Sequence, residues 1–262
     1  MNDNLKILPL RDSYVEGYIK KIEMCTDPSE GFLHFAELYV KVYNPITGLQ
    51  HIELYDFQRS YLMNMHKERL SINLMARQMG KTMCAAIYIA WRAIFFDHQS
   101  IVVASNHSIS SKVILNSVRV IIENCPAALV PNLIVDNKTE FRLDNGSRIL
   151  AKPTRTNDLK GLRPDFLYLD EFAFVKSDDA NDFLYSVLPC MASKGQVAIA
   201  STPNQPNDTF AKIWESSQKQ SHSFKPFKAT WRDHPNRDAN WGAIQVSQMG
   251  QSAFDKEYEC IL

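Results

Sequence analysis

One stretch decides the fold of this chain, Leu74-Met75-Ala76-Arg77-Gln78-Met79-Gly80-Lys81-Thr82. It follows a short apolar run, 70–74, and precedes an apolar helical pattern over 83–96. A strand that turns through Gly-Lys-Thr into a helix is the context that a phosphate-binding P-loop requires. Backbone N–H groups at the start of the helix would face a polyphosphate, and the helix dipole would favour its negative charge.

The match to the P-loop pattern has one gap, because the pattern places a glycine where Met75 stands. An isolated Gly-Lys-Thr also occurs by chance at the start of helices, so the assignment of a P-loop depends on the rest of the chain. We expect Lys81 to reach the β- and γ-phosphates, and to be exposed and solvated when no nucleotide is bound. The Thr82 hydroxyl would coordinate Mg²⁺. The predicted phosphate-binding residues are Arg77, Gln78, Met79, Gly80, Lys81 and Thr82.

Length and composition set the class of protein. The chain has 262 residues, enough for one large α/β domain with a small accessory lobe. Its 29 basic and 29 acidic residues cancel, so net charge argues neither for nor against nucleic acid. The five cysteines form no Cys-x-x-Cys pair, which suits the reduced thiols of a cytosolic protein and argues against a zinc site. Met1–Asn4 is no signal peptide, and the apolar run 83–96 is too short to span a bilayer. We expect a soluble intracellular protein.

Apolar runs of strand length alternate with helical patterns. The predicted strands are 70–74, 100–105, 166–171 and 196–203, and the predicted helices include 54–62, 83–96 and 109–124. A turn is expected at Pro45, Thr47 and Gly48, and a hairpin over 138–152 around Asn145-Gly146. The alternation predicts a three-layer α/β fold with a mainly parallel central sheet.

No strong strand is expected past Pro206, where the composition turns polar and aromatic. We therefore expect the 262 residues to form a single domain. Its core subdomain would span about 51–208, and a small lid or linker subdomain about 209–262, joined by part of 1–50.

Polar residues stand at the ends of all four predicted strands, at 77–82, 105–106, 170–171 and 201–202. In open parallel sheets, ligands bind beyond the carboxyl ends of the strands, so this shared placement predicts one site. Asp170 would hold Mg²⁺ through water, and Glu171 would orient and activate the attacking water. The competing interpretation is that two acids merely end a strand and cap the next helix.

Two further signals stay open on the residues alone. One interpretation is that the side-chain amide of Gln58, which can both donate and accept hydrogen bonds, binds the edge of an adenine base. The other is that Gln58 is a solvated glutamine on a helix. Similarly, the hydroxyls of Ser201 and Thr202 would lie near the γ-phosphate and respond to its hydrolysis in one interpretation. In the other, Ser201-Thr202-Pro203 is an ordinary turn at the end of a strand.

Taken in order, these motifs resemble those of the large terminase subunits of tailed phages, whose phosphate-binding loop also lacks the first glycine. The resemblance covers about 55–262. The residues that carry it are Asp56-Phe57-Gln58-Arg59, Arg77-Gln78-Met79-Gly80-Lys81-Thr82, Leu143-Asp144-Asn145-Gly146-Ser147, Tyr168-Leu169-Asp170-Glu171-Phe172-Ala173-Phe174, Ser201-Thr202-Pro203-Asn204, Ile213-Trp214, Ala229-Thr230-Trp231 and Phe254-Asp255-Lys256-Glu257-Tyr258.

The resemblance implies a P-loop NTPase of the ASCE or RecA-like type. Its ATP- and Mg²⁺-dependent hydrolysis would drive double-stranded DNA into a procapsid. Ser201 and Thr202 would couple hydrolysis to movement. The implied partners are DNA, the portal of the procapsid, the small terminase subunit and further copies of the chain, in a ring that is pentameric on the portal and monomeric alone. The implied location is the host cell cytoplasm. The family's nuclease domain would follow this segment, so we expect a piece of a longer protein without nuclease activity.

One departure from the family concerns a cation that would act on a neighbour's ATP. The family usually has an Arg-Gly pair ahead of the strand that ends in the two acids, and here the pair is Lys160-Gly161, with Arg163 nearby. Lysine cannot make the planar bidentate contact of arginine. Three interpretations follow: Arg163 supplies the cation, Lys160 supplies it less effectively, or Arg77 acts on the ATP of its own copy. The alternative without a catalytic role is that Lys160 and Arg163 are solvated cations of a loop.

Two rival functions come from other classes of protein. A superfamily 2 helicase fragment also carries an Asp-Glu box, but it needs a second lobe. About 60 residues follow Ser201-Thr202-Pro203, and whole domains run to roughly 100–150. A nucleotide-gated binding module without turnover is disfavoured by Glu171 beside Asp170.

Overall fold

The computed structural model describes residues 12–44, 48–154, 159, 161–191 and 194–262. The N-terminal Met1–Asn4, the predicted turn residues Pro45 and Thr47, and the candidate cation Lys160 lie outside these ranges. Among the helices within them, none combines the length and apolar character needed to cross a membrane.

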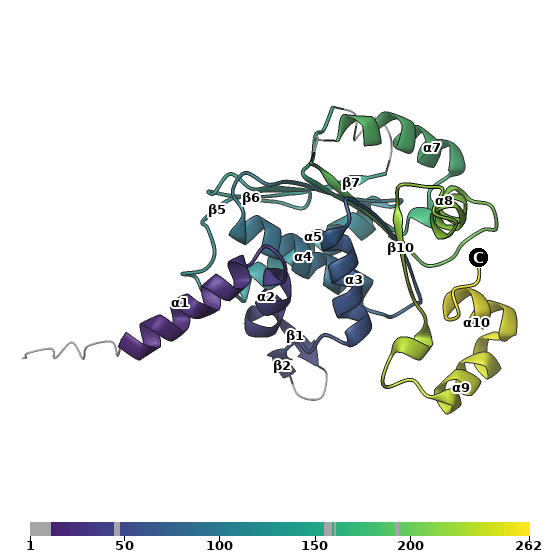
Figure 1. Cartoon of the computed structure of the whole chain (residues 1–262), viewed down its shortest axis with the longest axis horizontal. Coiled ribbons are helices and arrows are strands. Elements are labelled where there is room, and N and C mark those ends of the chain that lie inside the picture. Colours follow the sequence, from purple (N-terminus) through teal and green to yellow (C-terminus); the bar gives the residue numbers. More distant parts are fainter. Residues whose placement is uncertain (1–11, 45–47, 155–158, 160, 192–193) are drawn as a thin grey trace, which may run out of the picture.

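A twisted sheet forms the centre of the described part of the chain (Figure 1). Its strands are β3 (Leu70–Met75), β4 (Ser100–Ser105), β5 (Leu133–Asp136), β6 (Glu140–Leu143), β7 (Arg148–Pro153), β8 (Phe166–Asp170), β9 (Gln196–Ser201) and β10 (Lys225–Ala229). Their order across the sheet is β10-β3-β9-β8-β4-β7-β6-β5. The strands from β10 to β7 run parallel, and β6 and β5 extend the sheet antiparallel. The predicted mainly parallel sheet is confirmed.

Helices cover both faces of this sheet. The first face carries α3 (Asp56–Lys67), α4 (Lys81–Phe95) and α5 (Ser108–Glu123), and α7 (Ser177–Ser186) and α8 (Thr209–Gln218) lie on the other (Figure 1). The chain moves in opposite directions along the sheet from β3 to β4 and from β9 to β10, so right-handed crossovers place α4 and α8 on opposite faces. The fold has the three predicted layers.

The helix that follows the P-loop, α4, is buried on nearly all sides, which explains its almost unbroken apolar sequence. Its outer side packs against α2 (Gly31–Tyr39), which in turn contacts α1 (Asp12–Thr26) and the two-stranded sheet of β1 (Lys41–Asn44) and β2 (Gly48–His51). Trp91 Nε1 of α4 donates to the carbonyl oxygen of Cys25 at 2.7 Å, which joins the N-terminal helices to the core.

The hairpin prediction holds, since β6 and β7 pair antiparallel around Gly146, whose φ is 82°. The prediction that no strand follows Pro206 is wrong. Lys225–Ala229 forms β10 and pairs in parallel with β3. Two lysines and a proline in this segment break the apolar run that marks a buried strand, and β10 is a partly exposed edge strand for which such residues are usual.

The chain ends in a small lobe of α9 (Ala239–Met249) and α10 (Gln251–Glu257) beside β10 (Figure 1). Its centre is a cluster of aromatic rings with centroids 5.1–5.7 Å apart, formed by Trp231, Trp241, Phe254 and Tyr258. The N–H of Arg77 donates to the Glu257 carbonyl oxygen at 2.9 Å, so this lobe touches the P-loop directly. The division of the chain into subdomains stays a prediction.

Candidate functional site

The loop between β3 and α4 has the backbone conformation of a helix-initiating turn. Gly80 has φ 80° and ψ 19°, in the left-handed region that favours glycine. The conformation thus favours glycine, and a Cβ added there would lie 2.6 Å from Nε2 of Gln58 and would displace that side-chain amide. Gln78 also has a positive φ, 60°, which costs a residue with a side chain about 1 kcal/mol or more.

A cavity of about 640 Å³ opens where this loop meets the ends of four strands. It lies at the carboxyl ends of β3, β4, β8 and β9, as the polar strand ends predict. The lining residues include Arg77, Gln78, Met79, Gly80, Lys81, Thr82, Ser105, Asn106, Glu171 and Thr202. Four separate stretches of sequence therefore supply one site.

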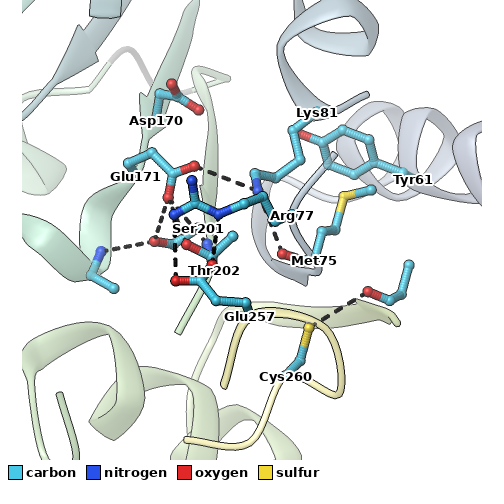
Figure 2. Close-up of polar contacts among 12 residues, drawn as sticks. Tyr61, Met75, Arg77, Lys81, Asp170, Glu171, Ser201, Thr202, Glu257 and Cys260 are labelled. Carbon is cyan, nitrogen blue, oxygen red and sulfur yellow. Dashed lines mark hydrogen bonds and ion pairs between the residues drawn. The ribbon is translucent and has the colours of Figure 1, made fainter. Parts of the chain in front are cut away.

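Lys81 lies inside this cavity in a fixed position. Its side chain is 8% exposed, and its Nζ lies 3.4 Å from the Met75 carbonyl oxygen and 3.5 Å from Oε1 of Glu171 (Figure 2). The expectation of an exposed, solvated lysine is wrong, because the carbonyl and the carboxylate hold the ammonium group within the site before any nucleotide arrives.

Glu171 joins two of the predicted motifs. Its Oε2 accepts hydrogen bonds from Ser201 Oγ at 3.2 Å, the Thr202 backbone N–H at 3.1 Å and Thr202 Oγ1 at 3.3 Å (Figure 2). Glu171 stands at the start of the short 3₁₀ helix Phe172–Phe174, with φ 48°, yet its side chain caps no N–H of that helix. The capping interpretation therefore does not account for the position of this carboxylate.

Asp170 lies deeper than Glu171. It is 6% exposed, and Oδ1 accepts a hydrogen bond from the Tyr168 hydroxyl at 3.4 Å, which in turn lies 3.1 Å from the Tyr61 hydroxyl. Burial, followed by repulsion from Glu171, raises the pKa of Asp170 to about 7, although Lys81 and Tyr168 oppose the rise. A buried carboxylate in this state is poorly compensated by the protein alone.

Gln58 contacts the P-loop rather than solvent. Its Oε1 accepts from the Tyr55 N–H at 3.1 Å, and its Nε2 donates to the Met79 carbonyl oxygen at 3.2 Å. The first bond is half of a capping box that begins α3, and the second holds the loop. The amide thus has a structural task without nucleotide, and the adenine contact stays a prediction.

The three candidate cations have different positions. Arg77 lines the cavity, and its guanidinium pairs with Glu257, with Nε 2.8 Å from Oε2 (Figure 2). The hydrogen bond to Glu257 raises the pKa of Arg77 above its ordinary value. Arg163 is exposed, and within the described ranges it lines no part of this cavity and forms no ion pair. Lys160 lies outside the described residues.

Several residues at the site were missed by sequence reasoning. Tyr168 stands two positions before Asp170, so strand alternation places both on one face and was a signal available in the sequence. Glu257 and Arg237 reach the loop from the C-terminal lobe. Arg237 contacts backbone carbonyls, which leave no trace in a side-chain pattern.

Comparison with known proteins gives a consistent family. The sequence profile described as "Terminase large subunit, T4likevirus-type, N-terminal" matches residues 72–261. The chain is similar in structure to the large terminase ATPase domain of Thermus phage P74-26, with TM-score 0.60, 18% identity, and coverage of 79% of this chain and 93% of that one.

Two longer solved structures are also similar. The bacteriophage HK97 large terminase has TM-score 0.70 and 15% identity, with 88% of this chain and 54% of that chain covered. The large terminase of a thermophilic bacteriophage, in complex with ADP, has TM-score 0.62 and 11% identity, with 80% and 53% covered. This chain thus spans about half the length of these two proteins.

Proposed function

This chain belongs to the family of terminase large subunits, and we propose that its cavity binds and hydrolyses ATP to drive double-stranded DNA into a procapsid. The observation that carries the proposal is that the lysine of the P-loop and a carboxylate lie together at one cavity. Lys81 Nζ and Glu171 Oε1 lie 3.5 Å apart there, beside the N-terminus of α4. The structures of the thermophilic phage terminase in complexes with ADP and with ATP-γ-S support a nucleotide as the ligand.

The loop supplies the groups that a triphosphate needs. Backbone N–H groups at the start of α4, the positive end of the helix dipole and the Lys81 ammonium all favour a polyanion. Lys81 is already held at the cavity, so little side-chain entropy is lost when phosphate displaces its contact with Glu171. Gln78, Met79, Gly80 and Thr82 are the remaining phosphate-binding residues of the proposal, and Gln58 the adenine-side residue.

The residues present also fit Mg²⁺. The donors are the Thr82 hydroxyl in the cavity lining and the carboxylate of Asp170, both hard oxygen ligands of the kind Mg²⁺ prefers. The raised pKa of Asp170 marks a buried negative charge that the protein compensates incompletely, which is the electrostatic condition that a cation would relieve. Thr82 and Asp170 would hold the ion, which supplies charge neutralisation on the phosphates when bound.

Glu171 is the proposed general base. As a water oxygen forms its bond to the γ-phosphorus and the bond to ADP breaks, Glu171 accepts the proton of that water. The same carboxylate oxygen that binds Ser201 and Thr202 would then change charge during turnover. Through those three hydrogen bonds the charge of the base would act directly on Ser201 and Thr202, the proposed coupling residues at the end of β9.

A cation that stabilises the transferring phosphoryl group is also part of the proposal. Arg77 would act in cis after leaving Glu257, or Arg163 would act on a neighbouring copy, which its exposure away from its own cavity would allow. Lys160 remains the third candidate. The partners of the motor are double-stranded DNA, the portal of the procapsid, the small terminase subunit and copies of this chain in a ring, within the host cytoplasm.

The experiment that tests this function compares the parent with Glu171→Gln. The amide retains the shape of the side chain and removes the base, so ATP should bind with near-parent affinity while phosphate release falls by about 10²–10⁴-fold. Lys81→Ala is the matched variant with the opposite signature, losing binding of the fluorescent analogue mant-ATP. A folded Glu171→Gln protein that releases phosphate at the parent rate would overturn the assignment of the base. Unchanged mant-ATP affinity in Lys81→Ala would overturn the P-loop.

A further inference from the structure

Arg237 reaches the P-loop from the C-terminal lobe, on the segment between the 3₁₀ helix Trp231–Asp233 and α9. Its Nη1 donates to the Arg77 carbonyl oxygen at 3.3 Å, and its Nη2 donates to the Gln78 carbonyl oxygen at 3.0 Å. One guanidinium thus bridges two consecutive peptide groups of the loop. The planar fork of arginine suits this bidentate contact, whereas an ammonium group does not.

The surroundings of the Arg237 guanidinium hold it against these carbonyls. It stacks over the ring of Trp241, with its carbon 4.6 Å from the ring centroid, and lies 5.8 Å from the centroid of Tyr258. Within the described ranges it forms no ion pair with a carboxylate. The Arg237 side chain is half-buried, and this burial lowers the pKa of Arg237 from its ordinary value. The aromatic face fixes its orientation and leaves the loop as its hydrogen-bond acceptor.

Three consecutive carbonyls of the loop accept bonds from outside the loop. Arg237 takes those of Arg77 and Gln78, and Gln58 takes that of Met79 at 3.2 Å. In a trans peptide the N–H points opposite to the C=O, so holding these carbonyls on one side directs the N–H groups of the same peptides to the other side. A cation on the carbonyl oxygens also polarises each peptide and makes its N–H a stronger donor.

This support matters because the loop is strained. Gln78 adopts φ 60°, a conformation that residues with a side chain rarely hold without help from their surroundings. The first glycine of the P-loop pattern is replaced by Met75, which is fully buried at the end of β3, so the loop has less conformational freedom at its start. The two hydrogen bonds from Arg237 fall on the two peptide groups that flank the α-carbon of Gln78.

We propose that Arg237 is a positioning residue for nucleotide binding, which acts in cis by holding the carbonyls of Arg77 and Gln78 so that the loop presents its N–H groups to phosphate. The proposal rests on the proposed function of the same site. Arg237 touches the side of the loop from which its carbonyls point and is not among the described residues that line the cavity, so it would contribute through the loop.

The chain offers a matched control in Arg232. Arg232 lies in the same lobe, stacks over Trp231 at the same 4.6 Å, and pairs with Glu259 rather than with the loop. Substitution to glutamine at either position removes one stacked arginine from the lobe. Only Arg237→Gln removes the contact with the P-loop.

The test measures mant-ATP and mant-ADP affinity, phosphate release and thermal unfolding for the parent, Arg237→Gln, Arg237→Lys, Arg232→Gln and Lys81→Ala. We expect Arg237→Gln to raise the dissociation constant of both nucleotides by about tenfold, since it removes charge-assisted bonds from the phosphate-binding loop. Arg237→Lys should fall between Arg237→Gln and the parent, because lysine keeps the charge without the fork. Arg232→Gln should bind like the parent.

The outcomes separate this inference from the function on which it rests. If the parent binds mant-ATP and Lys81→Ala does not, the site is a nucleotide site; parent-like affinity in folded Arg237→Gln would then overturn the positioning role alone. A lower melting temperature with unchanged affinity per folded molecule would assign Arg237 a purely structural role and would also overturn it. Failure of the parent itself to bind nucleotide would instead refute the proposed function. Equal losses in Arg232→Gln and Arg237→Gln would place the effect in the lobe as a whole and not in the contact with the loop.

Discussion

Asp170 is deeply buried, and its negative charge therefore lowers the free energy of unfolding of the protein without nucleotide. It is 6% exposed, and Glu171 beside it adds repulsion that Lys81 offsets only in part. A carboxyl whose pKa is raised on folding binds its proton more tightly in the native state than in the unfolded chain. The stability of the protein therefore declines as pH rises from the ordinary value of 3.8 to about 7, and the full cost is present above that range.

The variant Asp170→Asn should therefore be more stable than the parent at pH 8 without nucleotide or metal. The neutral amide has no proton to lose, and it still accepts the hydrogen bond from Tyr168. The gain should be on the order of 1–4 kcal/mol at pH 8 and should vanish as pH falls below the ordinary value of 3.8, where the parent carboxyl becomes protonated in both states. Urea unfolding in the presence of a chelator, at several pH values, measures it.

The control for this prediction is Asp97→Asn, which changes an exposed aspartate. Its effect on stability should be small, within about 0.5 kcal/mol. If Asp170→Asn gave no gain at pH 8, or a gain that stayed constant with pH, the buried carboxyl would not carry the electrostatic cost ascribed to it.

At the scale of elements, the turn from β3 into α4 brings Gly80 close to Gln58 of α3. Gly80→Ala should destabilise the protein through two effects, the left-handed φ of 80° and the 2.6 Å approach of the new methyl group to Nε2 of Gln58. We expect a total loss of about 1–3 kcal/mol, with weaker mant-ATP binding, because the Gln58 amide must give up its hydrogen bond to the Met79 carbonyl oxygen.

A second substitution separates the two effects. In Gly80→Ala with Gln58→Ala the clash is gone and the conformational cost of about 1 kcal/mol remains, so the Gly80→Ala step should cost less in the Gln58→Ala background than in the parent. Gly48→Ala shows the conformational cost by itself, since φ is 77° and no atom of the described residues lies within 4 Å of the added carbon. Equal costs of Gly80→Ala in both backgrounds would show that Gln58 does not confine the loop.

The elements also show how far sequence reasoning reaches. The strands β3, β4, β8 and β9 were predictable because parallel strands buried on both faces are continuous apolar runs, and their polar ends converge by topology. The edge strand β10 was not, since Lys225, Pro226 and Lys228 suit a loop equally well and only pairing with β3 selects the strand. At the site, Lys81, Glu171 and Thr202 were predictable from local motifs. The contacts from Arg237 and Glu257 were not, because they join residues about 160–180 positions apart.

At the scale of the whole molecule, the proposed ring predicts that a cation of one copy completes the cavity of its neighbour. Arg163 is exposed, and Arg77 is occupied by Glu257, so an isolated copy offers its own cavity little besides Lys81. A cation supplied across an interface is worth roughly 10³–10⁵ in rate for phosphoryl transfer. Specific activity should therefore rise with protein concentration, or on addition of DNA and portal that gather subunits.

A mixture of two inactive variants identifies the residue that supplies the cation to a neighbouring copy. Glu171→Gln, which retains Arg163, should restore activity to Arg163→Ala when the two are combined at high concentration, and the same mixture with Lys160→Ala tests the other loop cation. Phosphate release by each variant alone is the control. Activity independent of concentration, with no rescue in either mixture, would leave Arg77 in cis as the candidate.

The hydrogen bonds that fasten the P-loop have a consequence for the order in which the protein is made. The backbone N–H of Ala76 is bonded to Ala229, and that of Arg77 to Glu257, so the loop acquires its native anchors only after residues 180 positions downstream have emerged from the ribosome. At bacterial rates of translation this is a delay of roughly 10–40 s. Until residues 225–229 are made, β3 lacks its neighbour β10 and presents an unpaired edge, the kind of surface that recruits chaperones or aggregates. In the proposed motor, competence to bind nucleotide would therefore follow the synthesis of β10 and of the C-terminal lobe that fasten the loop.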